Sequence, residues 1–259
     1  MGRNRDRLEG FGIKPLYPGR DGAKGGRLRL RSPGRKHFKR NNLEQHETWL
    51  REEMERLGVK FPSPVLISEE NILGNLGAIM RRNFYEGAGQ RVEFLVNQLQ
   101  QPVRRAFLTV RSYDSFFLST YRKRIEENAV DPFQDYEAPL CLLETTWPDV
   151  IEELRDACRA EEFFVCVHED RLTSKEQLRL LFPELPKTGW KPVKWQVNAS
   201  KPEEQLIEIQ NGFWQKMHDK PSPGLGRIAF SDEQTKKFQA RYEADLNVIS
   251  KMDGVTLVR

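Results

Sequence analysis

Short apolar runs alternate along the chain with longer segments whose apolar residues recur at helical spacing. The apolar runs predict buried strands, which we expect at 65–67, 105–110 and 163–167. The helical spacing predicts helices near Asn71 and at 43–57, 89–99, 115–127, 147–160, 174–181, 202–217 and 231–252. Alternating strands and helices favour a three-layer α/β fold, in which a parallel sheet has helices on both faces.

The first forty residues differ from this pattern. They are rich in glycine and proline, which predicts a loop with no regular structure beyond a short opening helical turn. They also hold 13 Lys and Arg against 3 Asp and Glu, so the net charge of +4 comes entirely from this segment. The length of 259 residues suits one domain. We therefore expect a single domain over 1–259, with 1–40 as a basic N-terminal segment.

Composition narrows the class of protein. The chain is 38% hydrophobic and 31% charged, which is typical of a globular protein with a polar surface. No run of eighteen apolar residues occurs and polar residues follow Met1, so we expect neither a spanning helix nor a signal peptide, and hence a cytoplasmic protein. The three cysteines lack metal-ligand spacing, and we expect neither a disulfide nor a metal site.

One constellation points to phosphate chemistry. Arg111 directly follows the predicted strand 105–110, and Ser119 lies eight residues later in the next helix. Ligands of open α/β sheets bind at the carboxyl ends of the strands, where the start of a helix favours an anion. A guanidinium can hold two phosphate oxygens and a serine hydroxyl can add a hydrogen bond. The alternative is an arginine paired with a nearby carboxylate and a serine without a binding role.

The surrounding residues resemble the 3′-phosphate-binding motif of the sulfotransferase family. In that motif a strand leads to an arginine, then a turn that often contains Asp, a serine eight residues after the arginine and a tyrosine two residues later. Arg111, Asp114, Ser119 and Tyr121 match it, although Ser112 and Tyr113 replace a frequent Asn-Pro pair. Further similarity extends over nearly the whole chain. The resemblance implies a P-loop NTPase-like architecture and 3′-phosphoadenosine 5′-phosphosulfate as sulfuryl donor, with no metal.

The family's P-loop is missing from the sequence. No Gly-rich Lys-Thr element precedes the segment around Asn4 that resembles the end of the helix after that loop. The fold is therefore expected to lack its usual first strand, whose neighbours would lose hydrogen-bond partners. Either the chain is the downstream part of a longer protein, or another segment or a partner fills the gap.

The resemblance also implies roles for other residues. Glu69 or Glu70, after the strand 65–67, is the expected catalytic base, although both could instead cap the helix near Asn71. Trp190 and Lys191 resemble the family's late nucleotide-contacting loop, and the alternative for the tryptophan is packing onto the domain. The expected cofactor-binding residues are thus Arg111, Ser119, Trp190 and Lys191.

Three functions remain open from the sequence. The first is transfer of a sulfuryl group from the nucleotide donor to a hydroxyl or amine acceptor, such as one on a carbohydrate. The second is a non-catalytic nucleotide-binding or assembly module derived from the same fold. The third is nucleic-acid binding through the basic segment, but its aromatic residues are sparse, and we do not expect a nucleic-acid partner.

Overall fold

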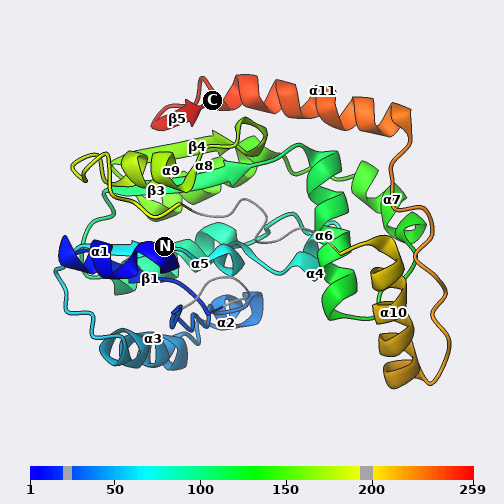
Figure 1. Ribbon diagram of the computed structural model, residues 1–259, viewed down its shortest axis with the longest axis horizontal. Helices are drawn as coiled ribbons and strands as arrows, with labels where there is room; N and C mark the ends of the chain where they lie inside the picture. Colours follow the sequence, from blue (N-terminus) through cyan, green and yellow to red (C-terminus); the bar gives the residue numbers. More distant parts are fainter. Residues whose placement is uncertain (20–24, 193–200) are drawn as a thin grey trace.

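The computed structural model describes residues 1–19, 25–192 and 201–259. Within these ranges the chain is an α/β protein with eleven α-helices and two short parallel sheets (Figure 1). The α/β class expected from the alternation is therefore confirmed. None of the helices in the described ranges is both long and apolar enough to cross a lipid bilayer.

The smaller sheet pairs β1 (Lys14–Leu16) with β2 (Val65–Ile67) in parallel. The short opening helix, α1 (Arg5–Gly10), agrees with the expectation for 1–40, but the expected loop after it is wrong, because this range also contains β1 and α2 (Arg35–Lys39). Pairing with β2, some fifty residues later, stabilises a three-residue strand whose own sequence includes a proline. Such a long-range contact leaves no local pattern in the sequence.

The larger sheet has the parallel order β3–β4–β5. It consists of β3 (Arg105–Val110), β4 (Glu162–Val167) and β5 (Val255–Val258). The first two strands confirm the prediction. The third was missed because its four residues at the end of the chain are too few for a periodicity argument.

Most predicted helices are present within a few residues of their expected bounds. They are α3 (Glu44–Arg56), α5 (Ala88–Gln98), α6 (Tyr113–Glu127), α8 (Trp147–Cys158), α9 (Ser174–Leu181), α10 (Glu203–His218) and α11 (Asp232–Ile249). The helix near Asn71 is a short 3-10 turn, η2 (Glu70–Leu73), followed by α4 (Leu76–Ile79). The unpredicted α7 (Phe133–Cys141) contains Pro139, which weakened the helical signal.

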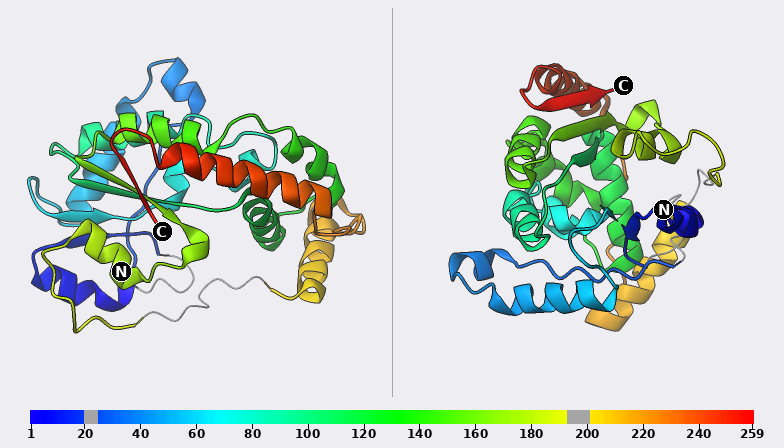
Figure 2. Two further views of the ribbon diagram at one scale, coloured as in Figure 1. Left: turned by 90° about the horizontal axis from the view of Figure 1, so that it is seen from above. Right: turned by 90° about the vertical axis from the view of Figure 1, so that its left-hand side faces the viewer.

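Helices lie on opposite sides of the strands. Figure 2 shows α5 and α8 on one side, and α1 and α9 on the other. The main apolar core surrounds β3 and β4 and includes the buried rings of Tyr113, Phe117 and Trp147. Two smaller apolar clusters accompany the β1–β2 sheet, one against α3 and α5 and the other against α1 and α9. Both sides of the strands are therefore apolar.

Candidate functional site

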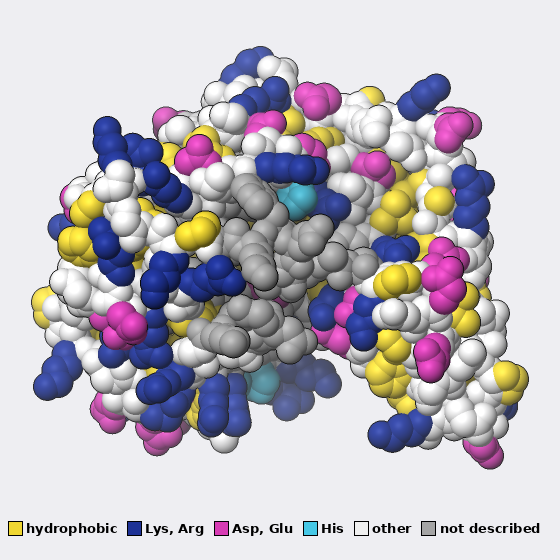
Figure 3. All heavy atoms as spheres, in the orientation of Figure 1, with side chains coloured by type: hydrophobic (Ala, Val, Ile, Leu, Met, Phe, Trp, Pro, Cys, Tyr) yellow, Lys and Arg dark blue, Asp and Glu magenta, His cyan; other side chains and the backbone are white. Residues whose placement is uncertain are grey.

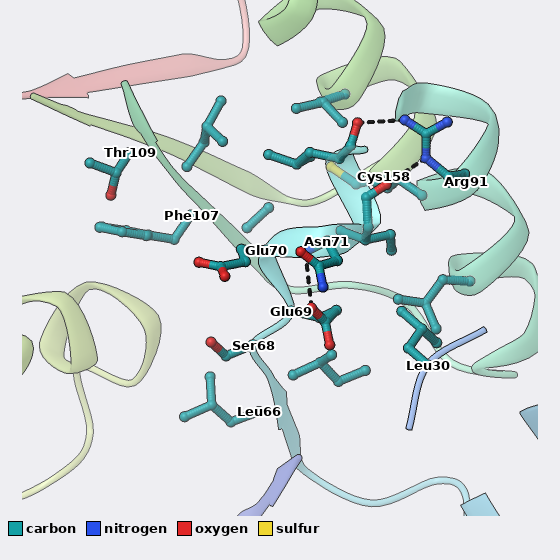
Figure 4. A pocket seen from close by; sticks show the side chains of 18 of the residues that line it. Leu30, Leu66, Ser68, Glu69, Glu70, Asn71, Arg91, Phe107, Thr109 and Cys158 are labelled. Carbon is teal, nitrogen blue, oxygen red and sulfur yellow. Dashed lines mark hydrogen bonds between the residues drawn. The ribbon is translucent and has the colours of Figure 1, made fainter. Parts of the chain in front are cut away.

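A large cleft lies between the two sheets. Its volume is about 2080 Å³, and its walls include β2, β3 and residues of α5, α6 and α9. Ligand pockets for small molecules typically occupy about 300–1,000 Å³. The cleft therefore has room for more than one small ligand. Figure 4 shows β2 and β3 on either side of it, with side chains of both strands between them.

Arg111 lies at the carboxyl end of β3 and lines the cleft. Its Nε donates a hydrogen bond of 2.9 Å to Ser115 Oγ, and its carbonyl accepts one of 2.9 Å from Trp147 Nε1. Among the described residues, no carboxylate forms an ion pair with this guanidinium and no protein acceptor lies on its two terminal nitrogens. The geometry thus differs from the alternative of an arginine paired with a carboxylate.

A polar stripe follows Arg111 along α6. Ser115, Ser119 and Lys123 succeed one another at intervals of four residues, which places them on one face of the helix. Ser119 and Lys123 both line the cleft, and Lys123 Nζ lies 3.3 Å from Glu127 Oε1. Arg111 and Ser119, which the sequence grouped by their places after a strand and in the next helix and by the sulfotransferase-like motif, therefore line the same cleft.

The start of α6 is not the open anion-binding site that the sequence predicts. Ser112 is the N-cap residue, but its hydroxyl donates to the carboxylate of Asp114 instead of capping the helix. Its backbone N–H donates to Glu169 Oε1 at 3.1 Å, while Glu169 Oε2 accepts from Tyr242 Oη at 3.1 Å. The Ser112 N–H is thus already bonded to a carboxylate, whose negative charge disfavours a second anion at this helix start.

His168 begins η3 (His168–Asp170) directly after β4 and also lines the cleft. Desolvation is the main cause that lowers its pKa below the ordinary value of 6.5, and the positive charge of Arg111 lowers the pKa further. A lowered pKa favours the neutral imidazole near neutral pH. In the sequence His168 directly follows the predicted strand 163–167, where it could either point toward the active face or have a structural role, and in the structure it lines the cleft within electrostatic reach of Arg111.

Glu69 and Glu70 both line the cleft at the end of β2, but they differ in orientation. Glu69 is the N-cap of η2, and its Oε1 accepts a 2.9 Å hydrogen bond from Asn71 N. Figure 4 shows the Glu69 side chain turned back over Asn71, whereas Glu70 points toward the side of the cleft where Phe107 lies. The capping alternative therefore describes Glu69, and Glu70 is the better placed of the two for chemistry in the cleft.

Trp190 and Lys191 are absent from the described lining of the cleft. The Trp190 ring packs against Phe11, with the Arg7 guanidinium 4.9 Å from its centroid, and its Nε1 donates to Pro186 O. Lys191 N donates to Asn4 Oδ1 at 2.8 Å. Both residues therefore hold the loop after α9 against the N-terminal helix. This position agrees with the alternative in which Trp190 packs onto the domain.

Two further features bear on the function classes. In the described ranges, no group of three or more His, Cys, Asp and Glu side chains is arranged to hold a metal ion. Figure 3 shows Lys and Arg side chains spread over the face that includes α1 to α3, interspersed with acidic and uncharged residues. On this face the basic side chains are thus dispersed among other residue types.

Comparison of the chain with protein-family models, with curated proteins and with solved structures finds no match.

Proposed function

We propose that the chain binds 3′-phosphoadenosine 5′-phosphosulfate and catalyses a sulfotransferase-type reaction, in which a sulfuryl group passes from this donor to a hydroxyl or amine acceptor. The observation that carries this proposal is the gathering of Arg111, Ser119, Lys123, His168 and Glu70 along one cleft at the carboxyl ends of parallel strands. Cationic, hydroxyl and proton-accepting groups together suit transfer between two oxygen atoms.

Each side chain has a distinct role in this proposal. The terminal nitrogens of Arg111 hold the 3′-phosphate, and Ser119 donates to a third oxygen. In the transfer step the acceptor oxygen or nitrogen forms a bond to sulfur, while the bond from sulfur to the 5′-phosphate oxygen breaks. Glu70, or the neutral imidazole of His168, takes the proton that the acceptor loses.

The finer architecture is part of the same proposal. The two sheets correspond to two portions of one P-loop-type sheet with helices on both faces, and the cleft lies where the first strand of such a sheet would run. The described residues provide no P-loop for the 5′-phosphosulfate. A chain that binds nucleotide without turnover, the non-catalytic alternative, is therefore distinguished from the enzyme only by an assay of transfer.

Nucleotide binding is tested by calorimetric titration with adenosine 3′,5′-bisphosphate. Adenosine 5′-monophosphate, which lacks the 3′-phosphate, is the control. We expect Arg111→Ala to weaken bisphosphate binding by about 10- to 100-fold, since a hydrogen bond to a charged group contributes about 1.5–3 kcal/mol. Arg104→Ala is the matched control, because Arg104 lines the opposite end of the cleft.

Two results would contradict the proposal: a folded chain that binds neither nucleotide, or equal affinity of the chain for both. If bisphosphate binds through Arg111 but sulfuryl transfer to a panel of hydroxyl and amine acceptors is undetectable, the non-catalytic module replaces the enzyme.

A further inference from the structure

The cleft separates two parallel sheets that each end in an open edge. β2 pairs with β1 on one side, and β3 pairs with β4 on one side. Within residues 1–19, 25–192 and 201–259, no strand pairs with the other edge of β2 or of β3. Because backbone N–H and C=O groups seek partners when they are removed from water, two facing open edges form an incomplete sheet.

In each sheet, alternate residues of a strand form backbone hydrogen bonds to the neighbouring strand, and this pattern identifies which backbone groups face the cleft. Lys14 N donates to Pro64 O and Ser68 N donates to Leu16 O, so alternate residues from Pro64 to Ser68 face β1. Val65 and Ile67 therefore point their backbone groups away from β1. The donation from Glu162 N to Arg104 O sets the same alternation in the larger sheet, in which Arg105, Phe107 and Thr109 point away from β4.

The two edges begin at the same end of the cleft. Gln101, just before β3, accepts a hydrogen bond from Ser63 N at 3.0 Å and donates one to Ser63 O at 3.0 Å, just before β2. The amino ends of β2 and β3 are thus joined across the base of the cleft. A strand between them could pair with both edges in parallel.

The walls define the chemistry of such a strand. On the side of α5 the cleft is lined by Leu95, Val96 and Leu99, and on the side of α9 by Leu181 and Phe182. Strands covered on both faces consist of continuous apolar residues rather than alternating ones. The wall residues 65–67 and 106–109 are uncharged, and charged residues line the two ends of the cleft. A bound segment with uncharged residues in its middle and polar residues at its two ends would fit this distribution.

We propose that the cleft binds an extended apolar segment of a partner polypeptide, which adds a central parallel strand and joins the two sheets into one. The segment has about six residues, because β3 has six and a strand of that length spans about 20 Å. This inference rests on the sheet edges alone and does not depend on nucleotide binding.

The test uses the full chain and a fluorescent peptide in which six consecutive valine and isoleucine residues lie between Ser-Gly-Lys flanks. The control peptide has the same side chains but carries N-methyl groups at alternate apolar residues, so that one edge loses its hydrogen bonds while apolar contact is retained. Fluorescence anisotropy measures both affinities. Hydrogen exchange measures the amides of Val65, Ile67, Phe107 and Thr109 with and without peptide.

We expect saturable binding of the unmodified peptide and exchange at these four amides that is slowed by about tenfold or more. N-methylation should weaken binding by at least about tenfold, because several backbone hydrogen bonds are lost together. Equal affinity for both peptides, absence of saturable binding, or protection of the same amides by self-association of the chain before peptide is added would each overturn the proposal.

Discussion

Tyr113 donates a hydrogen bond to the buried carboxylate of Asp245, which joins the first residue of α6 to α11 across 132 positions of sequence. Trp147 N, at the start of α8, donates to Tyr113 Oη at 2.8 Å and to the same carboxylate at 3.3 Å. Three helices thus meet at one buried polar cluster. Because Arg111 lies two residues before Tyr113, this cluster also positions the proposed phosphate-binding arginine.

Replacement of Asp245 should therefore destabilise the fold. Asp245→Ala leaves the Tyr113 hydroxyl without its acceptor, whereas Trp147 N keeps its shorter hydrogen bond to Tyr113 Oη. An unpaired buried group costs about 1–3 kcal/mol, so we expect the free energy of unfolding, measured by urea denaturation, to fall by about that amount. Glu243→Ala on the exposed face of α11 is the control and should change it by less than about 1 kcal/mol. Equal losses in both variants would show that the cluster is not stabilising.

Stability should depend on pH through His46. The side chain is partly buried in α3, its Nδ1 has no hydrogen-bond partner among the described residues, and its ring centroid lies 4.5 Å from that of His37. Desolvation, with a further contribution from His37, lowers the pKa of His46 below 6.5. The unfolded chain therefore binds a proton more readily, so stability is complete above about pH 6.5 and decreases as the pH falls below it.

We expect His46→Leu to reduce the slope of unfolding free energy against pH between about pH 5 and 7, measured by urea denaturation at several pH values. The exposed His218, replaced by Gln, is the matched control. A slope unchanged by His46→Leu would contradict the assignment.

The three thiols should differ in reactivity. Cys166 is buried in β4, and burial raises its pKa to about 12, whereas Cys141 is exposed at the end of α7. Since the thiolate is the reactive form, N-ethylmaleimide should label Cys141 well before Cys166. Mass spectrometry of the labelled native chain measures this order, and Cys141→Ser should remove the fast phase. Comparable rates at both thiols would contradict the buried position of Cys166.

Anion affinity should respond to Glu169, the carboxylate that accepts from Ser112 N at the start of α6. Glu169→Gln removes a negative charge near Arg111 and keeps an oxygen that can accept from Tyr242. We expect bisphosphate affinity to rise by about two- to fivefold, since a charge at a helix start is worth about 0.3–1 kcal/mol. Calorimetry measures the change, and Glu161→Gln, before β4, is the control. Unchanged affinity in Glu169→Gln would exclude electrostatic competition at this site.

The sequence by itself determined the elements whose signal is local. Apolar runs located β2, β3 and β4, and periodicity located seven of the longer helices in the described chain, because burial of one face repeats at a fixed spacing. The position of Arg111 after a strand and of Ser119 in the next helix also followed from local pattern. Both residues consequently fell within one cleft.

Only the tertiary structure decided the rest. β1 and β5 exist through pairing with strands about 50 and 90 residues away, and such contacts have no local pattern. The backbone N–H at the start of α6 is taken by Glu169, and Trp190 packs against the N-terminal helix, because each partner comes from a distant segment. The open edges of β2 and β3 likewise become visible only in the tertiary structure, where no strand of the described residues lies between the edges of the two sheets.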